Sequence, residues 1–249
     1  MPAQPAAPFR HGVLLYDGPQ EYLDGIFPFL SDGRESGAPM LVVVPGARMS
    51  LLRDALGPDS AGTRFADMAE VGANPARLIA LWQDFLSERG GDGPVRGVAE
   101  PVWPGRGPAE LLECQGHEAL LNLAFAGAHS FDLLCPYDGA RLEASVLQES
   151  VRAHPYRFAG GRPVTSGCAA VDADPARAFR ADLPDPPQTR DRLAFGRAEL
   201  PRVRDFISDR LAAAGAAGTR AGECLVAVNE VATNSLRHGG GAGLLSAWT

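Results

Sequence analysis

The residues best suited to chemistry near the end of the chain lie in the run VAVNEVATNSLRHG, residues 226–239. Glu230 and Asn234 are four residues apart, so on a helix both side chains project from the same face. A carboxylate and a carboxamide at this spacing can share a hydrated magnesium ion, or the carboxylate can act as a base while the amide binds the metal. Taken alone, the pair is weak evidence for such a site and is more typical of an ordinary solvated helix face.

A second group of polar and aromatic side chains follows the predicted strands of the first 155 residues. In an open parallel sheet, ligands bind beyond the carboxyl ends of the strands. These strand ends therefore predict a pocket for a small ligand that carries hydrogen-bond donors or a cation. The residues that we expect around the ligand are Tyr16, Glu100, Trp103, His117, Tyr137 and Asp138.

Other interpretations of these strand ends stay open. The segments are rich in proline, aspartate and glycine, which is also typical of plain turns. Trp103 could belong to the core, and the carboxylates could pair with arginines such as Arg96 or Arg141.

The predicted helix ELLECQGHEALLNLAF contains a conceivable pair of metal ligands. Glu113 and His117 are four residues apart, and Cys114 lies three residues before His117. Metal sites need three or four ligands, however, and no second cluster of histidine and cysteine shows similar spacing. We therefore favour a hydrogen-bonded, buried helix face here.

The composition excludes several classes of protein. The chain has 249 residues and a net charge of −7, and all 23 of its basic residues are arginine. The lack of lysine excludes a lysine Schiff base and a phosphate loop of the GxxxxGK[ST] kind. The acidic balance argues against direct binding of nucleic acid or anionic lipid. Four widely spaced cysteines, no signal core and no long apolar stretch predict a cytoplasmic protein without a membrane segment.

Short apolar runs alternate with amphipathic runs along the first 155 residues. Strands are predicted over residues 11–16, 40–44, 64–68, 95–99 and 131–135, and helices over 19–35, 49–56, 74–88, 110–126 and 142–154. Strands separated by helices of this length are typical of parallel pairing with right-handed crossovers. We therefore predict an α/β fold with an open, mostly parallel sheet.

The pattern changes after about residue 158. A proline-rich, aperiodic stretch over residues 159–191 predicts a linker. Beyond it we expect a strand over 192–195, helices over 200–213 and 220–237, and a strand that starts at residue 244. The predicted organisation is a disordered tail (1–8), a sensory domain (9–158), the linker (159–191) and a small α+β domain (192–249).

The first domain resembles the MEDS (methanogen/methylotroph sensory) family. The resemblance rests on HGVLLYDGPQEYL, LVVVP, PVRGVAEPVW, ELLECQGHEALLNLAF and LLCPYD, and it covers residues 9–158. It implies a RecA-like α/β fold, without a working phosphate loop, that senses a small molecule.

The run VAVNEVATNSLRHGGG resembles the N-box of GHKL ATPases, and among them the anti-sigma-factor serine kinases. The resemblance implies ATP and magnesium as cofactors, Glu230 as the catalytic base and Asn234 as the magnesium ligand. Arg237 and His238 match the helix end that closes over the phosphates. The glycine-rich boxes that follow the N-box in this family do not appear in the sequence. We therefore expect an incomplete domain, with no ATP binding or kinase activity of its own.

Together, the two resemblances imply a cytoplasmic signalling regulator of the actinobacterial kind. A small-molecule sensor would control a kinase module that binds a sigma factor and phosphorylates an anti-anti-sigma protein. Alternatives are a stand-alone, hydrolase-like enzyme with Glu100 or Asp138 as acid or base, and a non-catalytic interaction scaffold. A homodimer is left open, and no contact with nucleic acid or membrane is expected.

Overall fold

The computed structural model describes residues 8–88, 93–128, 130–166, 187 and 191–248. The chain divides into two compact units, residues 1–181 and 182–249, and each is described by itself. The elements of the first unit are β1 (Arg10–Tyr16), α1 (Gly18–Glu35), β2 (Met40–Val44), α2 (Gly46–Leu56), β3 (Thr63–Asp67), α3 (Met68–Val71), α4 (Arg77–Ser87), β4 (Val95–Ala99), α5 (Pro108–Ala124), β5 (Phe131–Asp138), α6 (Ala144–Ala153), β6 (Tyr156–Ala159) and β7 (Arg162–Thr165).

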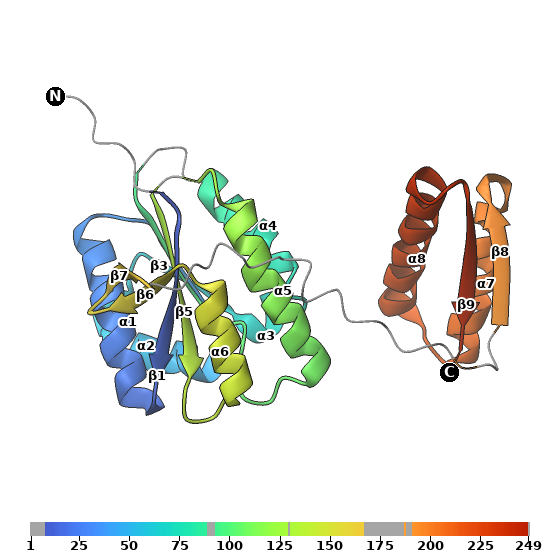
Figure 1. Cartoon of the computed structure of the whole chain (residues 1–249). Coiled ribbons are helices and arrows are strands. Elements are labelled where there is room, and N and C mark those ends of the chain that lie inside the picture. Colours follow the sequence, from blue (N-terminus) through green and yellow to red (C-terminus); the bar gives the residue numbers. More distant parts are fainter. Residues whose placement is uncertain (1–7, 89–92, 129, 167–186, 188–190, 249) are drawn as a thin grey trace. The chain divides into compact units, whose positions relative to one another are not determined.

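The strands of the first unit form one seven-stranded sheet in the order β3-β2-β4-β5-β1-β6-β7 (Figure 1). Every described pair of strands in it is parallel except β6 with β7. The prediction of an α/β fold with a mostly parallel sheet is therefore confirmed. The predicted strand over 40–44 is β2, whose five residues are all buried, as expected where helices cover both faces of a sheet.

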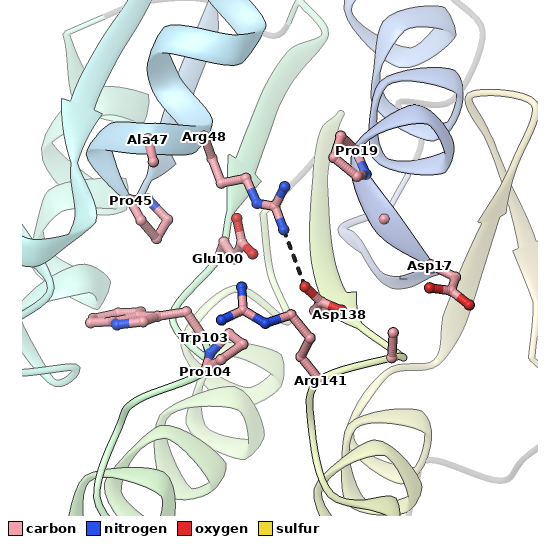
Figure 2. A pocket seen from close by; sticks show the side chains of 12 residues that line it. Asp17, Pro19, Pro45, Ala47, Arg48, Glu100, Trp103, Pro104, Asp138 and Arg141 are labelled. Atoms are coloured by element: carbon pink, nitrogen blue, oxygen red, sulfur yellow. Dashed lines mark hydrogen bonds and ion pairs between the residues drawn. The ribbon is translucent and has the colours of Figure 1, made fainter.

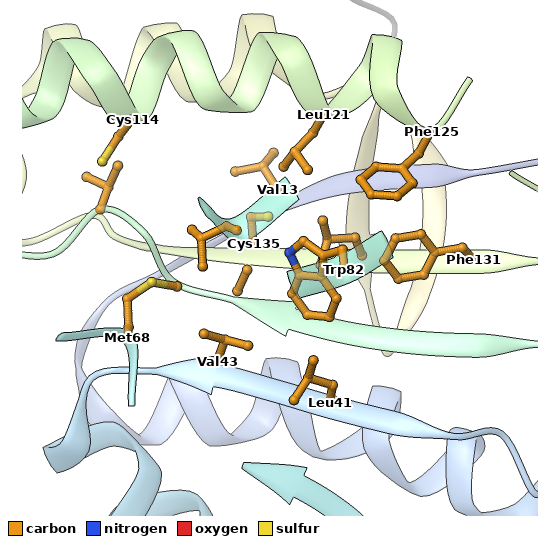
Figure 3. Close-up of a cluster of buried hydrophobic side chains, with 14 of the residues drawn as sticks. Val13, Leu41, Val43, Met68, Trp82, Cys114, Leu121, Phe125, Phe131 and Cys135 are labelled. Carbon is orange, nitrogen blue, oxygen red and sulfur yellow. The ribbon is translucent and has the colours of Figure 1, made fainter. Parts of the chain in front are cut away.

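Two hydrophobic cores fill the space between the sheet and its helices. Successive side chains of a strand point to opposite faces, so β2 supplies Leu41 and Val43 to one core and Val42 to the other. The first core lies under α3, α4, α5 and α6 and contains Trp82 and Phe131 (Figure 3). The second core lies under α1 and α2.

β5 extends three residues beyond the predicted end of its strand at residue 135. Proline normally disrupts a central strand because it lacks an N–H donor. The described pairing of β5 with β4 ends at Leu134, however, whereas the pairing with β1 continues to Asp138. At Pro136, β5 is therefore paired with β1 alone, so the missing N–H does not prevent the strand from continuing to Asp138.

The predicted linker requires a correction at its start. Residues 156–165 form a hairpin that extends the sheet, with β6 parallel to β1 and β7 antiparallel to β6. The two four-residue strands are mostly exposed, so they show no apolar period in the sequence. The rest of the predicted linker, apart from Ser166, Pro187 and Asp191, lies outside the described residues, and so do residues 1–7 of the predicted tail.

The second unit contains β8 (Asp191–Gly196), α7 (Leu200–Ala213), α8 (Gly218–His238) and β9 (Ala242–Ala247). The two strands form an antiparallel pair. Its core is small, and its buried members are Phe195, Val203, Ala232 and Leu236. None of the helices in the described part of either unit is long and apolar enough to cross a membrane.

Candidate functional site

A cavity of about 380 Å³ opens at the carboxyl ends of four neighbouring strands, β1, β2, β4 and β5 (Figure 2). Its lining comes from the loops and helix starts that follow these strands: Asp17, Gly18, Pro19, Pro45, Ala47, Arg48, Glu100, Trp103, Pro104, Asp138, Ala140 and Arg141. The chain leaves β2 toward β3 but leaves the neighbouring β4 toward β5, in the opposite direction along the sheet. Such a reversal separates the two connecting loops and creates a crevice at the strand ends.

Glu100 follows β4 and is a buried carboxyl group, only 1% exposed. The hydroxyl of Tyr16 donates to Oε1 at 2.9 Å, and the hydroxyl of Tyr22 donates to Oε2 at 3.4 Å. Burial raises the pKa of Glu100 to about 7, although the two tyrosines and Arg48 favour the charged form. Glu100 therefore changes its protonation state near neutral pH.

Arg48, from the first turns of α2, connects this carboxyl group to the end of β5. Its Nη2 atom lies 2.9 Å from the Tyr16 hydroxyl oxygen and 3.2 Å from Oδ2 of Asp138. The guanidinium also stacks over the rings of Tyr16 and Tyr22, with Cζ 5.1 and 4.8 Å from the ring centroids. Burial raises the pKa of Tyr16 above its ordinary value, so this hydroxyl stays protonated and can donate to Glu100.

Asp138 and Arg141 each present a polar group to the cavity that has no partner in the described part of the chain. Oδ1 of Asp138 is buried and accepts no hydrogen bond from the described residues. The Arg141 side chain points toward the middle of the cavity, between Trp103 and Asp138 (Figure 2). Arg141 is exposed, and within the described ranges its guanidinium forms no hydrogen bond or ion pair. As far as the described residues show, the cavity therefore offers an unpaired buried acceptor at Asp138 and an unpaired cationic donor at Arg141.

Trp103 forms an apolar wall beside these groups. It is half-buried, and the Cζ atom of Arg106 lies 3.9 Å from the centroid of its ring. Arg106 is itself held by the carbonyl oxygens of Pro101, at 2.6 Å, and Gly72, at 2.8 Å. The indole is thus supported on one side by a buried, fully engaged arginine.

The start of α1 also reaches the cavity, and the residue before this helix, Asp17, has its own N–H engaged. The N–H of Asp17 donates to Oε2 of Glu21 at 2.8 Å. Pro19, in the first turn, has no N–H to offer.

The structure brings together four of the six residues expected around the ligand. Glu100, Trp103 and Asp138 line the cavity, and Tyr16 lies behind it against Glu100. The placement of Tyr137 requires a correction. It precedes Asp138 on β5, so its side chain points to the opposite face of the sheet. There its hydroxyl donates to Oε1 of Glu118 at 3.2 Å.

His117 also lies outside the cavity, in the buried face of α5. Neither of its ring nitrogens has a hydrogen-bond partner among the described residues, and burial lowers its pKa to about 4. Glu113, the other half of the conceivable metal pair, is exposed, whereas Cys114 and His117 are buried. The spacing of four residues therefore does not bring this pair to a common site.

Arg48 lines the cavity, but the sequence analysis did not single it out. The alternatives considered for the carboxylates were Arg96 and Arg141, but Arg96 pairs with Asp32. Arg48 pairs with Asp138 instead, although 90 residues separate them in the chain. The only signal in the sequence is its position directly after the β2 loop Pro45-Gly46, at the same sheet edge as Asp138.

The candidate residues of the second unit lie together near the end of α8. Glu230 and Asn234 are one turn apart and both exposed, and Arg237 and His238 follow in the exposed last turn. In the described part of the chain, neither Glu230 nor Asn234 forms a side-chain hydrogen bond or ion pair. Both side chains are therefore available to a ligand.

One comparison with known proteins gave a match. A family model described as MEDS, the methanogen/methylotroph, DcmR sensory domain, matches residues 10–155. This range begins with β1 and ends directly after α6, so it contains the four strands that carry the cavity. No curated protein and no solved structure matches the chain significantly.

Proposed function

The chain belongs to the MEDS family of sensory domains, and from this premise we propose that its first unit senses a small organic acid bound in the cavity. The observation that carries the proposal is the pair of unsatisfied groups at the cavity. The Arg141 guanidinium has no partner in the described residues, and Oδ1 of Asp138 is a buried acceptor without a donor. Buried polar groups are normally paired, so the unpaired Oδ1 of Asp138, beside the exposed cation of Arg141, is explained best by a ligand.

The arrangement of the cavity defines the chemistry of that ligand. An anionic group would bind Arg141, because guanidinium groups recognise carboxylates in a planar, two-point geometry. A hydroxyl or amino group of the same molecule would donate to Oδ1 of Asp138. The apolar part would lie against Trp103. A volume of about 380 Å³ is at the lower end of the range for ligand pockets, which favours a small molecule.

Binding of the ligand would also affect residues outside the cavity. Arg48 contacts Asp138 and Tyr16, and Tyr16 contacts Glu100. A ligand donor on Asp138 would compete with Arg48 for this carboxylate, and any shift of Arg48 would change the charge beside Glu100. Through the contact between Asp138 and Arg48, ligand binding would thus change the surroundings of α2, the helix that carries Arg48.

A thermal-shift screen of the full chain tests this proposal. The panel consists of small hydroxy- and aminocarboxylic acids, and a ligand at 100 times its dissociation constant adds about 2.7 kcal/mol to the free energy of unfolding. Arg141→Gln should abolish the shift without changing the melting temperature of the free protein. Arg157→Gln, which changes an exposed arginine outside the cavity, is the matched control and should leave the shift unchanged. Equal shifts in both variants would contradict the proposal.

For the second unit we propose a GHKL-type module of an anti-sigma-factor serine kinase, in a regulator that acts in the cytoplasm. Its partners would be a sigma factor and an anti-anti-sigma protein. In an intact domain of this kind, Glu230 would act as the base, Asn234 would hold magnesium, and Arg237 and His238 would lie near the phosphates of ATP. The exposure of Glu230 and Asn234 on one face of α8, without partners among the described residues, supports this assignment.

The partner and the nucleotide are tested separately. The purified chain is mixed with purified sigma factors and analysed by size-exclusion chromatography, with and without the acid found in the screen. Formation of a complex that the acid changes supports control by the sensory unit. Any magnesium-dependent binding of ATP should be lost in Asn234→Ala and kept in Glu230→Gln, because only the first substitution removes a metal ligand.

One observation favours a second function, a hydrolase-like activity of the cavity. A buried carboxyl group with a pKa of about 7 suits a general acid or base at neutral pH, and Glu100 has this property. Asp138, the other acidic candidate, is paired with Arg48. The described lining contains no serine, threonine, cysteine, lysine or histidine, so the nucleophile would have to be water or one of the carboxylates. Conversion of a bound acid by the wild type but not by Glu100→Gln would favour the enzyme.

A further inference from the structure

We propose that the core of the first unit binds a zinc-type divalent cation through His11, Glu118, Cys135 and His154. These residues come from β1, α5, β5 and the position directly after α6, and all four are at most 2% exposed. One potential ligand atom from each residue lies within 4.8 Å of the other three. The cluster lies on the α5 and α6 face of the sheet, and none of its members lines the cavity at the strand ends.

Three of the six distances between these atoms are close to the edges of a coordination tetrahedron, and all six are within 4.8 Å. The Nε2 atom of His11 lies 3.0 Å from Oε2 of Glu118 and 3.3 Å from Sγ of Cys135. The Nε2 atom of His154 lies 3.3 Å from the same Oε2. Ligand atoms about 2.1 Å from a central ion are about 3.4 Å apart in a tetrahedral site. A cation could therefore be bound without a large rearrangement of the surrounding core.

The hydrogen bonds of the two histidines direct their Nε2 atoms at the proposed ion. Nδ1 of His154 lies 2.6 Å from the carbonyl oxygen of Ser150, which can only accept a hydrogen bond. Nδ1 of His11 lies 3.1 Å from Oδ1 of Asn122, whose amide nitrogen already donates to a backbone carbonyl. Both Nδ1 atoms are therefore donors, and each neutral ring presents an Nε2 lone pair. Metal-binding histidines are held in this way by acceptors behind the ring.

Without a cation, the cluster contains more acceptors than donors. Two Nε2 lone pairs face one carboxylate, and neither Nε2 of His154 nor Oε2 of Glu118 forms a hydrogen bond of good geometry with the described residues. The other carboxylate oxygen, Oε1, accepts from the hydroxyl of Tyr137 at 3.2 Å. Buried acceptors that face one another are costly. A shared cation removes this cost.

The ligand set and its charge select the kind of ion. Two imidazoles, a thiolate and a carboxylate suit zinc, whereas calcium and magnesium prefer oxygen ligands. Binding releases the thiol proton of Cys135 to solvent. The thiolate and the carboxylate of Glu118 then neutralise the two positive charges, so the buried site carries no net charge. Four protein ligands without access to water are typical of a structural site that is filled during folding.

The test uses the tag-free, full-length chain, produced in medium that contains zinc. We expect about one zinc ion per chain by mass spectrometry of the purified protein. Cys135→Ser and His154→Gln should lower this content several-fold. Cys114→Ser is the matched control, because Cys114 is an equally buried thiol of the same core that contacts Pro101 instead of the cluster. It should leave the zinc content unchanged.

A second measurement covers the case in which the variants do not fold. The wild-type chain is unfolded with a chelator and refolded with cobalt(II) as the probe. A thiolate-to-cobalt charge-transfer band, together with the visible bands of tetrahedral cobalt, supports the site. A zinc content far below one per chain combined with no thiolate band would overturn the proposal. Equal zinc contents in Cys135→Ser and Cys114→Ser would also overturn it, and the cluster would then be a protonated His–Glu–His network.

Discussion

Arg48 and Asp138, which are 90 residues apart in the chain, meet at the cavity with 3.2 Å between Nη2 and Oδ2. The same Nη2 atom lies 2.9 Å from the hydroxyl oxygen of Tyr16, which in turn donates to Glu100. These contacts connect the ends of β1, β4 and β5 to the first turns of α2. A change at one of the four residues should therefore alter both the stability of the unit and the binding of a ligand.

Arg48→Met should destabilise the protein, because it leaves the carboxylate of Asp138 buried and unpaired. Asp138 is 2% exposed at its side chain and Arg48 is 18% exposed, so we expect a loss of about 3 kcal/mol in the free energy of unfolding. The double variant Arg48→Met/Asp138→Asn should recover part of this loss. Denaturant unfolding of the four proteins in a double-mutant cycle measures the coupling. Strictly additive losses would show that the pair does not interact.

Glu100→Gln should change how stability depends on pH. The pKa of Glu100 rises from 4.5 to about 7 on folding, so the folded state binds this proton more tightly than the unfolded state does. The resulting contribution of Glu100 to the free energy of unfolding is complete below pH 4.5. It falls as the pH rises to about 7 and is absent above that pH. Its size is about 3 kcal/mol.

The measurement is the free energy of unfolding of the wild type minus that of Glu100→Gln, at several pH values between 4 and 8. Subtraction removes the contributions of other titrating groups, which are the same in both proteins. A difference that stays constant, or that increases with pH, would contradict the raised pKa.

Trp103→Ala should weaken ligand binding more than it weakens the fold. The indole is half-buried at the cavity, whereas Trp82 is fully buried in the core under α4. Truncation of a buried tryptophan costs about 3–5 kcal/mol, and we expect this loss for Trp82→Ala but a smaller one for Trp103→Ala. Thermal unfolding and titration with the acid found in the screen measure both effects. If Trp103→Ala is as destabilising as Trp82→Ala and binds the acid normally, Trp103 belongs to the core.

Gly97→Ala should be destabilising because β4 has no room for a methyl group at this position. A Cβ atom would lie 2.8 Å from Cδ1 of Leu133 and 2.8 Å from ring atoms of Trp82. Overpacking of this kind costs about 1–3 kcal/mol. Gly127→Ala is the control, since a Cβ atom at that position would have no heavy atom of another segment within 4 Å. Denaturant midpoints that are equal for the two variants would show that the core adapts at Gly97.

Local sequence patterns were sufficient for most of the elements. The continuous apolar run of β2 predicted a strand buried on both faces, and the helices between the strands predicted parallel pairing; the structure confirms both. The resemblance of the first domain to the MEDS family is confirmed by the family match. The hairpin β6–β7 was missed because its short, mostly exposed strands are defined by pairing with β1 rather than by their own apolar pattern.

The sequence by itself indicated the five strands β1 to β5 and the residues that follow them, and so it pointed to Glu100, Trp103 and Asp138 at one sheet edge. This was possible because hydrophobic periodicity is a local property and the edge of a parallel sheet follows from strand direction. Only the tertiary structure decided that Arg48 pairs with Asp138. It alone also brought together His11, Glu118, Cys135 and His154. The physical reason is that spacing in a sequence reports neighbours within a turn or a strand, whereas these groups meet through the order of the strands and the packing of helices on the sheet.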